Sequence, residues 1–227
     1  RSWRSGRKTS GRERERMRRE IPWSFYFITD SRLTRQGGLR DSEDAIRGGA
    51  RVIQYREKDK HFEEMTAEAG ALLELCKRSG ADLIINDNLE VGCAVGAGGV
   101  HIGQDDAPLA KAREVLPNGI IGVSCGTLQE VRLAEVGGAD YIAASPVFFT
   151  STKKDIGRPV GLDGIALFRE ATDLPIVAIG GINLGNVREV VLAGADSVCA
   201  ISATVGTADV AASVREFEAI VKKARKE

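Results

Sequence analysis

The chain repeats one short junction five times, and this repeat limits the folds that the chain can adopt. In each copy a helix-like segment ends in glycine, usually followed by alanine, and leads directly into a short apolar strand. The copies read GGARVIQYR at 48–56, SGADLIIND at 79–87, AGGVHIGQ at 97–104, GGADYIAAS at 137–145 and AGADSVCAIS at 193–202. Glycine ends helices well because it adopts the left-handed conformation without a Cβ penalty. Strands that are apolar throughout are typical of parallel strands buried on both faces. The repeat therefore predicts helices that alternate with buried parallel strands.

Three further apolar segments bring the number of predicted strands to eight. They are FYFITD at 25–30, IIGVSC at 120–125 and PIVAIGGI at 175–182. Helical periodicity lies between the strands, for example at 61–78 and 184–193, and a last helix is expected over about 207–225. Parallel strands with helical crossovers form either an open doubly wound sheet or a closed barrel. Eight units in about 210 residues, without a G-x-G-x-x-G fingerprint after the first strand, favour an α/β fold of the (β/α)8 TIM-barrel type.

Composition agrees with one globular domain of this kind. The hydrophobic fraction is 43%, which excludes disorder of the whole chain, and the 26 glycines suit many tight turns. No apolar run approaches the ~20 residues that a membrane helix needs, so we expect a soluble protein. We assign residues 1–20 to a basic, disordered arm and residues 21–227 to the barrel.

The neutral net charge hides an asymmetry. The chain has 32 basic and 32 acidic residues, yet residues 1–16 hold seven bases against two acids. A basic arm can bind nucleic acid or a membrane surface. This one lacks the interleaved aromatics of a nucleic-acid arm and the apolar region and cleavage site of a signal peptide. We therefore expect neither a nucleic-acid nor a membrane partner and leave residues 1–16 out of the fold interpretation.

The cysteines indicate a reducing compartment. The four cysteines, Cys76, Cys93, Cys125 and Cys199, are scattered without a C-x-x-C pair. Three of them lie in apolar patterns where a small buried side chain is expected. This favours a cytoplasmic protein. His61 and His101 have no partner at ligand spacing, so a metal site would depend on carboxylates.

Polar residues follow the predicted strands where each strand ends. In a TIM barrel these ends meet at one face, which carries the active site. After the second to sixth strands the sequence places Gln54, Arg56, Glu57, Lys58, Asn86, Asp87, Gln104, Asp105, Asp106, Ser124, Ser145, Thr150, Ser151, Thr152, Lys153 and Lys154. So many polar residues on one rim predict a polar active site there.

The ends of the last two strands predict a phosphate site. Gly180-Gly181 and Ser202 lie where barrels of this fold commonly hold phosphate with backbone N–H groups and a helix N-terminus. The alternative is that the glycines only permit a tight turn. Arg56, Lys58 and Lys153 add three cations to the same rim. One phosphate does not need that much positive charge, so a second polyanionic group such as a diphosphate is expected.

Two carboxylates on the rim predict a divalent cation. Asp87 and Asp106 come from the third and fourth strands, and both would repel phosphate oxygens unless a cation bridged them. Mg²⁺ held by one or two carboxylates and substrate phosphates meets that need. The alternative is that each aspartate caps the helix that follows it, over 88–97 or 107–115.

At this point the residues resemble the thiamine-phosphate synthase family. The resemblance covers nearly the whole chain from about Ser24 onward. It is carried by YFITD (26–30), QYREK (54–58), IND (85–87), GVHIGQDD (99–106), GVSC (122–125), SPVFFTSTKKD (145–155), AIGGI (178–182) and ISA (201–203).

The resemblance implies two substrates and a role for each predicted residue. The diphosphate of 4-amino-2-methyl-5-hydroxymethylpyrimidine would be bound by Gln54, Arg56, Lys58, Asn86, Ser124 and Lys153. Asp87 and Asp106 would hold Mg²⁺ on that diphosphate. Thiazole phosphate would be bound by Thr150, Thr152, Gly181, Ile201 and Ser202. The residues expected to act in catalysis are Arg56, Lys58, Ser124 and Lys153.

The expected reaction is a displacement that needs no side-chain nucleophile. The electron-rich pyrimidine lets the C–O bond break before attack, so stabilising the departing diphosphate is the main catalytic task. The thiazole nitrogen then attacks the methylene carbon. Residues 148–161 are long and polar for a barrel loop, and we expect them to form a lid that excludes water.

Two positions depart from the pattern of the family. Phe149 stands where proline commonly precedes the first Thr of T-x-T-K, and Gly126 stands where a histidine is frequent. The second departure argues against a thiazole tautomerase-like relative, which resembles the synthase but uses that histidine. A sugar-phosphate isomerase or epimerase would need a paired acid and base, and a catalytically silent phosphate-binding barrel would be expected to lack part of the rim. The sequence leaves open the oligomeric state, including a homo-oligomer, and the form of the thiazole phosphate.

Overall fold

The computed structural model describes residues 21–150 and 158–227. It contains a sheet of eight parallel strands whose neighbours follow the order of the chain. A bridge between Phe25 and Val198 joins the first strand region to the last and closes the sheet into a barrel. The strands are β1 (Phe27–Ile28), β2 (Val52–Tyr55), β3 (Asp82–Asn86), β4 (Gly99–Ile102), β5 (Ile120–Cys125), β6 (Tyr141–Ala144), β7 (Ile176–Ile179) and β8 (Ser197–Cys199). The predicted (β/α)8 TIM barrel is confirmed.

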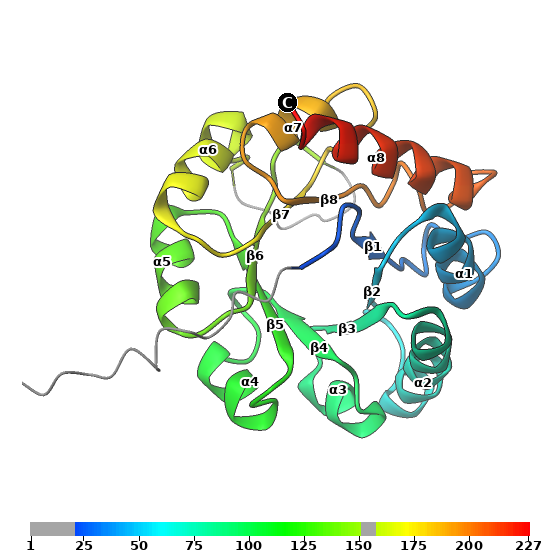
Figure 1. The fold of residues 1–227 in the computed structure, drawn as a ribbon. Helices are drawn as coiled ribbons and strands as arrows, with labels where there is room; N and C mark the ends of the chain where they lie inside the picture. Colours follow the sequence, from blue (N-terminus) through cyan, green and yellow to red (C-terminus); the bar gives the residue numbers. More distant parts are fainter. Residues whose placement is uncertain (1–20, 151–157) are drawn as a thin grey trace, which may run out of the picture.

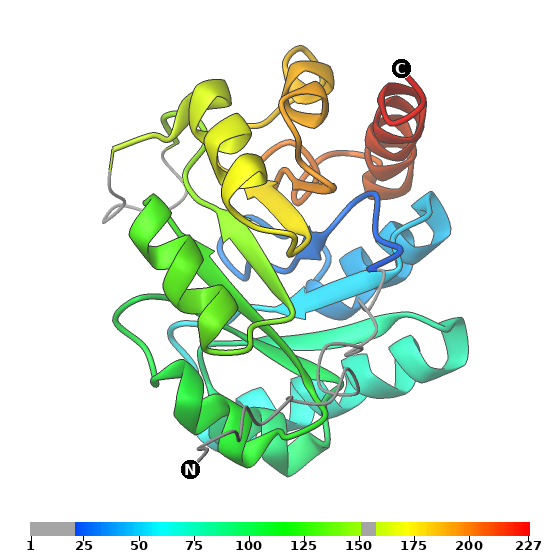
Figure 2. The same ribbon diagram turned by 60° about the vertical axis from the view of Figure 1, so that its left-hand side comes forward.

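Helices surround the strands on the outside of the barrel (Figure 1). They are α1 (Gly38–Gly48), α2 (Phe62–Ser79), α3 (Leu89–Val95), α4 (Leu109–Val115), α5 (Leu128–Val136), α6 (Gly161–Ala171), α7 (Val187–Leu192) and α8 (Val210–Ala224). The last helix packs between α7 and α1, so the end of the chain completes the outer ring, as Figures 1 and 2 show. The helix at 61–78 was predicted to within one residue, whereas α3, α4 and α7 are shorter than the predicted segments.

Left-handed glycines end the helices at the repeated junctions, as the sequence predicts. Gly49, Gly80, Gly138 and Gly194 have positive φ within their copies of the repeat. In the third copy the left-handed residue is Gly96, which precedes the predicted segment 97–104. The left-handed turn therefore lies closer to α3 than the sequence predicts.

The apolar residues form two layers, as a barrel requires. One layer lies between the strands and the helices and includes Ile53, Ile85, Ile121 and Phe217. The other fills the inside of the barrel with Trp23, Tyr26, Ile28, Val52, Ile84, Tyr141, Ala143, Val177 and Cys199. The Trp23 ring packs edge-on against the rings of Tyr26 and Tyr141, with centroids 5.4 and 5.6 Å apart. The interior of the barrel is therefore packed, and open space is left toward one end.

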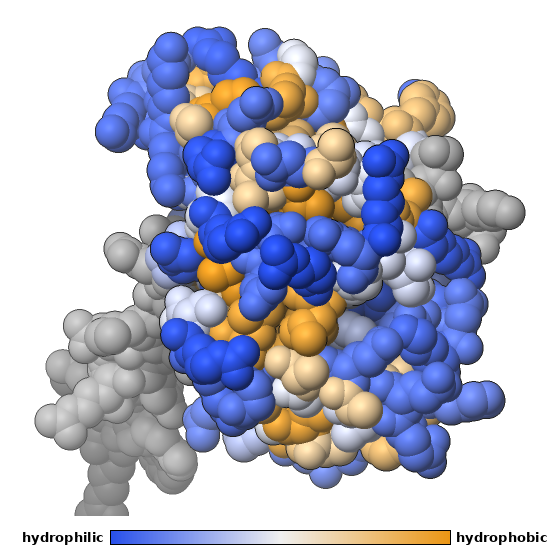
Figure 3. All heavy atoms as spheres, turned by 90° about the vertical axis from the view of Figure 1, so that its right-hand side faces the viewer, coloured by the Kyte–Doolittle hydropathy of each residue, from blue (hydrophilic) through white to orange (hydrophobic). Residues whose placement is uncertain are grey.

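Three of the four cysteines are buried, as predicted, and Cys93 is exposed. Burial raises the pKa of the Cys76 and Cys125 thiols to about 12. Over residues 21–150 and 158–227, no helix combines the length and the apolar character needed to cross a membrane. On the flank of α1 and α8, hydrophilic side chains cover most of the surface, with apolar ones visible between them (Figure 3).

Candidate active site

A cavity of about 310 Å³ lies at the ends of the strands. Every predicted site residue that the structure describes lines it: Gln54, Arg56, Lys58, Asn86, Asp87, Asp106, Ser124, Thr150, Gly181, Ile201 and Ser202. Thr152 and Lys153 fall within 151–157, outside the described residues, as does the middle of the predicted lid. Strands of a barrel all point the same way, so residues far apart in the chain meet at one rim.

Arg56 is held in place by an aspartate from the neighbouring strand end. Its Nη1 donates to Asp30 Oδ2 at 3.0 Å, and its backbone N–H donates to Thr29 Oγ1 at 3.0 Å. The other oxygen of Asp30, Oδ1, accepts from the backbone N–H groups of Arg32 and Leu33 at 3.0 and 3.2 Å. Asp30 is thus buried, and both of its carboxylate oxygens accept hydrogen bonds, one of them from Arg56.

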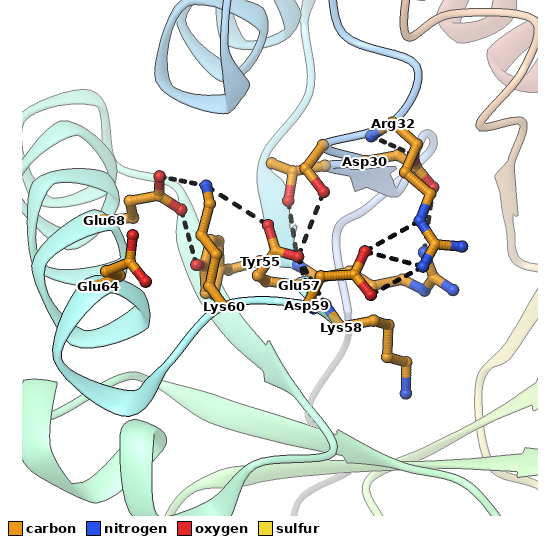
Figure 4. Close-up of polar contacts among 12 residues, drawn as sticks. Asp30, Arg32, Tyr55, Glu57, Lys58, Asp59, Lys60, Glu64 and Glu68 are labelled. Atoms are coloured by element: carbon orange, nitrogen blue, oxygen red, sulfur yellow. Dashed lines mark hydrogen bonds and ion pairs between the residues drawn. The ribbon is translucent and has the colours of Figure 1, made fainter.

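A network around Glu57 shapes the loop between β2 and α2 (Figure 4). The buried Glu57 carboxylate accepts from the backbone N–H groups of Lys58 and Asp59 at 2.7 and 3.0 Å. Lys60 lies between Glu57 and Glu68 and forms ion pairs with both. Burial alone would raise the pKa of Glu57, but these N–H donors, Ser31 and Lys60 lower it below its ordinary value. The loop is therefore fixed from behind, while the Lys58 side chain points away from the network.

Lys58 points instead toward Asp87 and Asp106, which we call the acidic pair. Its Nζ forms an ion pair with Asp87. Asp87 has φ of 61°, the only positive φ among the described non-glycine residues. Aspartate tolerates this conformation better than most residues, and such backbone strain concentrates at functional sites. No pattern in the sequence predicts this conformation.

Asp106 lies beside Asp87 in the wall of the cavity. Burial and this neighbour raise the pKa of Asp106, because two carboxylates in contact resist double ionisation. Asp106 also accepts from the backbone N–H of Gly103 at 2.6 Å. The capping alternative does not hold in the structure. Asn88 caps α3 by accepting from Val91 N, and Pro108 precedes α4.

The opposite side of the cavity is built from backbone. Gly180 and Gly181 have φ of 105° and 66°, and a Cβ on Gly181 would lie 2.6 Å from the Phe149 carbonyl oxygen. A tight turn therefore requires both glycines. The backbone N–H groups of Gly181 and Ser202 donate to no acceptor within residues 21–150 and 158–227, so they are available to an anion.

One part of the predicted phosphate site is different in the structure. Neither the glycine turn nor Ser202 leads directly into a helix, because α7 begins at Val187 and α8 at Val210. Hydrogen-bonded turns follow Ile201 instead, with Val205 N donating to Ile201 O at 2.8 Å and Thr207 N donating to Thr204 O at 3.3 Å. Backbone N–H groups, rather than a long helix, face this side of the cavity.

Sequence reasoning assigned no role to five residues that support this site. Asp30 and Glu57 position the cationic side chains, and Tyr26, His101 and Tyr141 lie beneath the cavity. Asp30 follows the first strand and could have been found by the same rule that identified the other rim residues. His101 and the two tyrosines lie in apolar strands, where the sequence gives no sign that they face one another.

The donor set limits which metal could bind. Within the described parts of the chain, no group of three or more His, Cys, Asp or Glu side chains is arranged to hold a metal ion. Asp87 and Asp106 supply only carboxylate oxygens, which suit a hard cation such as Mg²⁺ that takes its other ligands from substrate and water.

Comparison with known proteins agrees with this architecture. The family model described as thiamine monophosphate synthase matches residues 25–204. The thiamine-phosphate synthase of Chloroflexus aurantiacus is 46% identical over 202 residues, 88% of this chain and 94% of the relative. That of Moorella thermoacetica is 45% identical over 208 residues, 89% of this chain and 98% of the relative.

Solved structures show the same fold. The thiamine phosphate pyrophosphorylase of Pyrococcus furiosus superposes with a TM-score of 0.83 at 38% identity, covering 89% of this chain and 96% of the other. The 3-hexulose-6-phosphate synthase of Salmonella typhimurium has a TM-score of 0.67 at 18% identity, covering 88% of this chain and 99% of the other, and shares the fold alone. The chain belongs to the thiamine monophosphate synthase family, whose members are transferases of thiamine biosynthesis.

Proposed function

We propose that this chain condenses 4-amino-2-methyl-5-hydroxymethylpyrimidine diphosphate with thiazole phosphate to give thiamine phosphate and diphosphate. The observation that carries the proposal is the division of one cavity into two halves. One half combines Arg56 and Lys58 with an acidic pair, and the other presents free backbone N–H groups. Two phosphorylated substrates, one of them with a diphosphate, match that division.

In this proposal the charged half binds the pyrimidine diphosphate. Arg56 is already fixed by Asp30, so it meets the diphosphate with little loss of side-chain entropy. Lys58 is half-exposed and paired with Asp87, so it is free to turn from that carboxylate to a phosphate oxygen. Gln54, Asn86 and Ser124 would bind from the cavity wall. Lys153 would add a third positive charge beside the diphosphate.

Mg²⁺ fits the acidic pair of this chain. Asp106 and its neighbour Asp87 resist double ionisation, which raises the pKa of Asp106, and a divalent cation would relieve that repulsion. Once bound, Mg²⁺ would neutralise charge on the diphosphate as a Lewis acid. The two aspartates would hold it, with diphosphate oxygens and water as the remaining ligands.

The second half would bind thiazole phosphate. The N–H groups of Gly181 and Ser202 and the backbone at Ile201 would meet its phosphate, and Thr150 and Thr152 would contact the rest of the molecule. Backbone donors suit a phosphate because they carry fixed partial charge and lose no side-chain entropy. The thiazole nitrogen would thereby be held opposite the pyrimidine methylene.

The chemistry then needs charge and position rather than a nucleophilic side chain. The C–O bond of the pyrimidine breaks, its electron pair leaves with diphosphate, and a pyrimidine cation remains. Arg56, Lys58 and Lys153 would stabilise the leaving group, and exclusion of water from the cavity would protect the cation. The thiazole nitrogen donates its lone pair to the methylene carbon and forms the new C–N bond. The substrates are small molecules, and the reaction is expected in the cytoplasm without nucleic-acid or membrane partners.

The test is direct. The purified chain is mixed with pyrimidine diphosphate, Mg²⁺ and either the aromatic or the carboxylated thiazole phosphate, and thiamine phosphate and diphosphate are measured. We expect both products in equal amounts and loss of turnover when EDTA removes the metal. Absence of product with both thiazole forms would refute the function.

Matched variants test the metal site. Asp87→Asn and Asp106→Asn should each reduce turnover about 10²-fold or more at low Mg²⁺, because each removes a ligand. Asp105→Asn alters a neighbouring carboxylate on the same cavity wall and should have little effect. Equal losses in all three variants would contradict the assignment of the metal to Asp87 and Asp106.

A further inference from the structure

A chain of hydrogen bonds crosses the inside of the barrel and ends at the cavity. Gln54 Nε2 lies 3.1 Å from Tyr26 Oη, which lies 2.7 Å from Tyr141 Oη. Tyr141 Oη lies 2.9 Å from His101 Nδ1, and His101 Nε2 lies 2.9 Å from Ser124 Oγ. The first four residues are 7% exposed or less, so water does not compete freely for these bonds. Five different parts of the barrel wall contribute one residue each.

The direction of each hydrogen bond in this series follows from the bond between Gln54 and Tyr26. An amide nitrogen only donates, so Tyr26 Oη accepts from Gln54. The hydrogen of the buried Tyr26 hydroxyl then has Tyr141 Oη as its acceptor, because the opposite direction would leave this hydrogen without a partner among the described residues. Tyr141 has then accepted one bond and donates its single hydrogen to His101 Nδ1. Burial raises the pKa of both tyrosines well above the ordinary value, which keeps both hydroxyl groups protonated.

The tautomer of His101 determines which group donates in its hydrogen bond with Ser124. A neutral imidazole that accepts at Nδ1 carries its hydrogen on Nε2, and that hydrogen points to Ser124 Oγ. The hydrogen of the serine hydroxyl is then left for another acceptor. Within residues 21–150 and 158–227, no protein acceptor is bonded to it, and Ser124 lines the cavity. The backbone is held as well, because Gln104 Nε2 donates to Ser124 O at 2.6 Å.

We propose that His101, acting through Tyr141 and Tyr26, is a positioning residue that makes Ser124 a hydrogen-bond donor only toward the cavity. The inference rests on the proposed function, because it names what Ser124 offers the pyrimidine diphosphate. The acceptor atoms of that substrate are its ring nitrogens and phosphate oxygens. A hydroxyl group that turned its lone pairs to them would repel them, whereas one with a fixed donor direction binds without reorganisation.

A first experiment measures the tautomer of His101 directly and needs no substrate. The chain has two histidines, so ¹⁵N-histidine labelling gives two pairs of ring-nitrogen signals, and His61→Gln identifies the pair from His101. We expect the wild-type His101 ring to be neutral with its hydrogen on Nε2. A ring with its hydrogen on Nδ1 would overturn the proposal, whether or not the chain makes thiamine phosphate.

A second experiment uses two variants that each keep one arm of the histidine. Asn at position 101 can still reach the Tyr141 side, and Gln can still reach Ser124. His101→Asn should lower kcat about tenfold more than His101→Gln, with the KM for thiazole phosphate unchanged. Equal kcat values in the two variants would indicate a merely structural histidine and overturn the proposal.

A double-mutant cycle separates positioning from packing. In a Ser124→Ala background, His101→Asn should have almost no additional effect, because the group that it positions is gone. If the two losses simply add, the proposal is wrong. Should His101→Asn fail to fold in a thermal-unfolding assay, Tyr141→Phe serves instead, since it removes the hydrogen given to Nδ1 and keeps the ring. Thiamine phosphate formation by the wild type is measured alongside, so that failure of the proposed function is seen separately.

Discussion

Two aspartate–arginine pairs lie on the same rim, one buried with a single hydrogen bond between the side chains and one exposed with three. Comparing them tests whether burial outweighs the number of hydrogen bonds. Arg56 and Asp30 lie 3.0 Å apart, with side chains 20% and 4% exposed. Arg32 and Asp59 lie 2.8 Å apart, with side chains 70% and 59% exposed. We expect Asp30→Asn to lower stability and activity and Asp59→Asn to leave both nearly unchanged. Asparagine keeps the shape and the Oδ1 acceptor but replaces Oδ2 with an NH2 group. Each change therefore removes the charge and also the Oδ2 acceptor that the arginine uses.

The magnitude follows from the geometry of the buried pair. At 3.0 Å and an effective dielectric constant of about 20, two unit charges attract by about 5.5 kcal/mol. Desolvation of both groups offsets much of this, and a charged hydrogen bond contributes about 1.5–3 kcal/mol net. Asparagine at position 30 can still accept from the backbone N–H groups of Arg32 and Leu33. The free energy of unfolding should therefore fall by about 1.5–3 kcal/mol.

The same change should weaken the reaction because Arg56 loses its support. If about 1.4 kcal/mol of positioning is lost, kcat/KM falls about tenfold. The measurements are urea unfolding and thiamine phosphate formation for wild type, Asp30→Asn and Asp59→Asn at one ionic strength. Solvent and salt screen the exposed pair, so its variant is the control. The reasoning fails if Asp30→Asn costs less than about 0.5 kcal/mol, or if the two variants are equally destabilised.

Three further predictions concern the glycine turn, the β2–α2 loop and the thiols. Gly181→Ala should lower stability by about 2–4 kcal/mol in urea unfolding and raise the KM for thiazole phosphate, because its φ is 66° and the new Cβ would meet the Phe149 carbonyl at 2.6 Å. The lowered pKa of Glu57 means that its charge stabilises the fold above the unfolded-state pKa of about 4.5 and that this contribution disappears as pH falls through the folded-state value. The stability difference between wild type and Glu57→Gln should therefore shrink from about pH 7 to about pH 3, and a constant difference would contradict the assignment. Iodoacetamide should modify Cys93 well before the three buried cysteines, as mass spectrometry of the native protein would show, and simultaneous modification would contradict the burial.

Much of the fold could be predicted because it depends on local patterns that repeat. Helix-ending glycines and apolar strands of similar length recur along the chain, and only a closed or open parallel sheet satisfies them. The rim residues could be predicted for the same reason, because parallel strands bring their ends to one face. The ends of α4 and α7 were less predictable, since short helices carry weak periodicity.

What the sequence determined by itself is the alternation of elements and the face on which the polar residues gather. The tertiary structure decided which of those residues meet. Lys58 pairs with Asp87 and Arg56 with Asp30, 29 and 26 residues apart in the chain. The left-handed backbone of Asp87 and the chain from Gln54 to Ser124 appear only when all strands are in place. The physical reason is that such contacts depend on strand register and barrel closure, whereas sequence patterns report only which side of one strand or helix is buried.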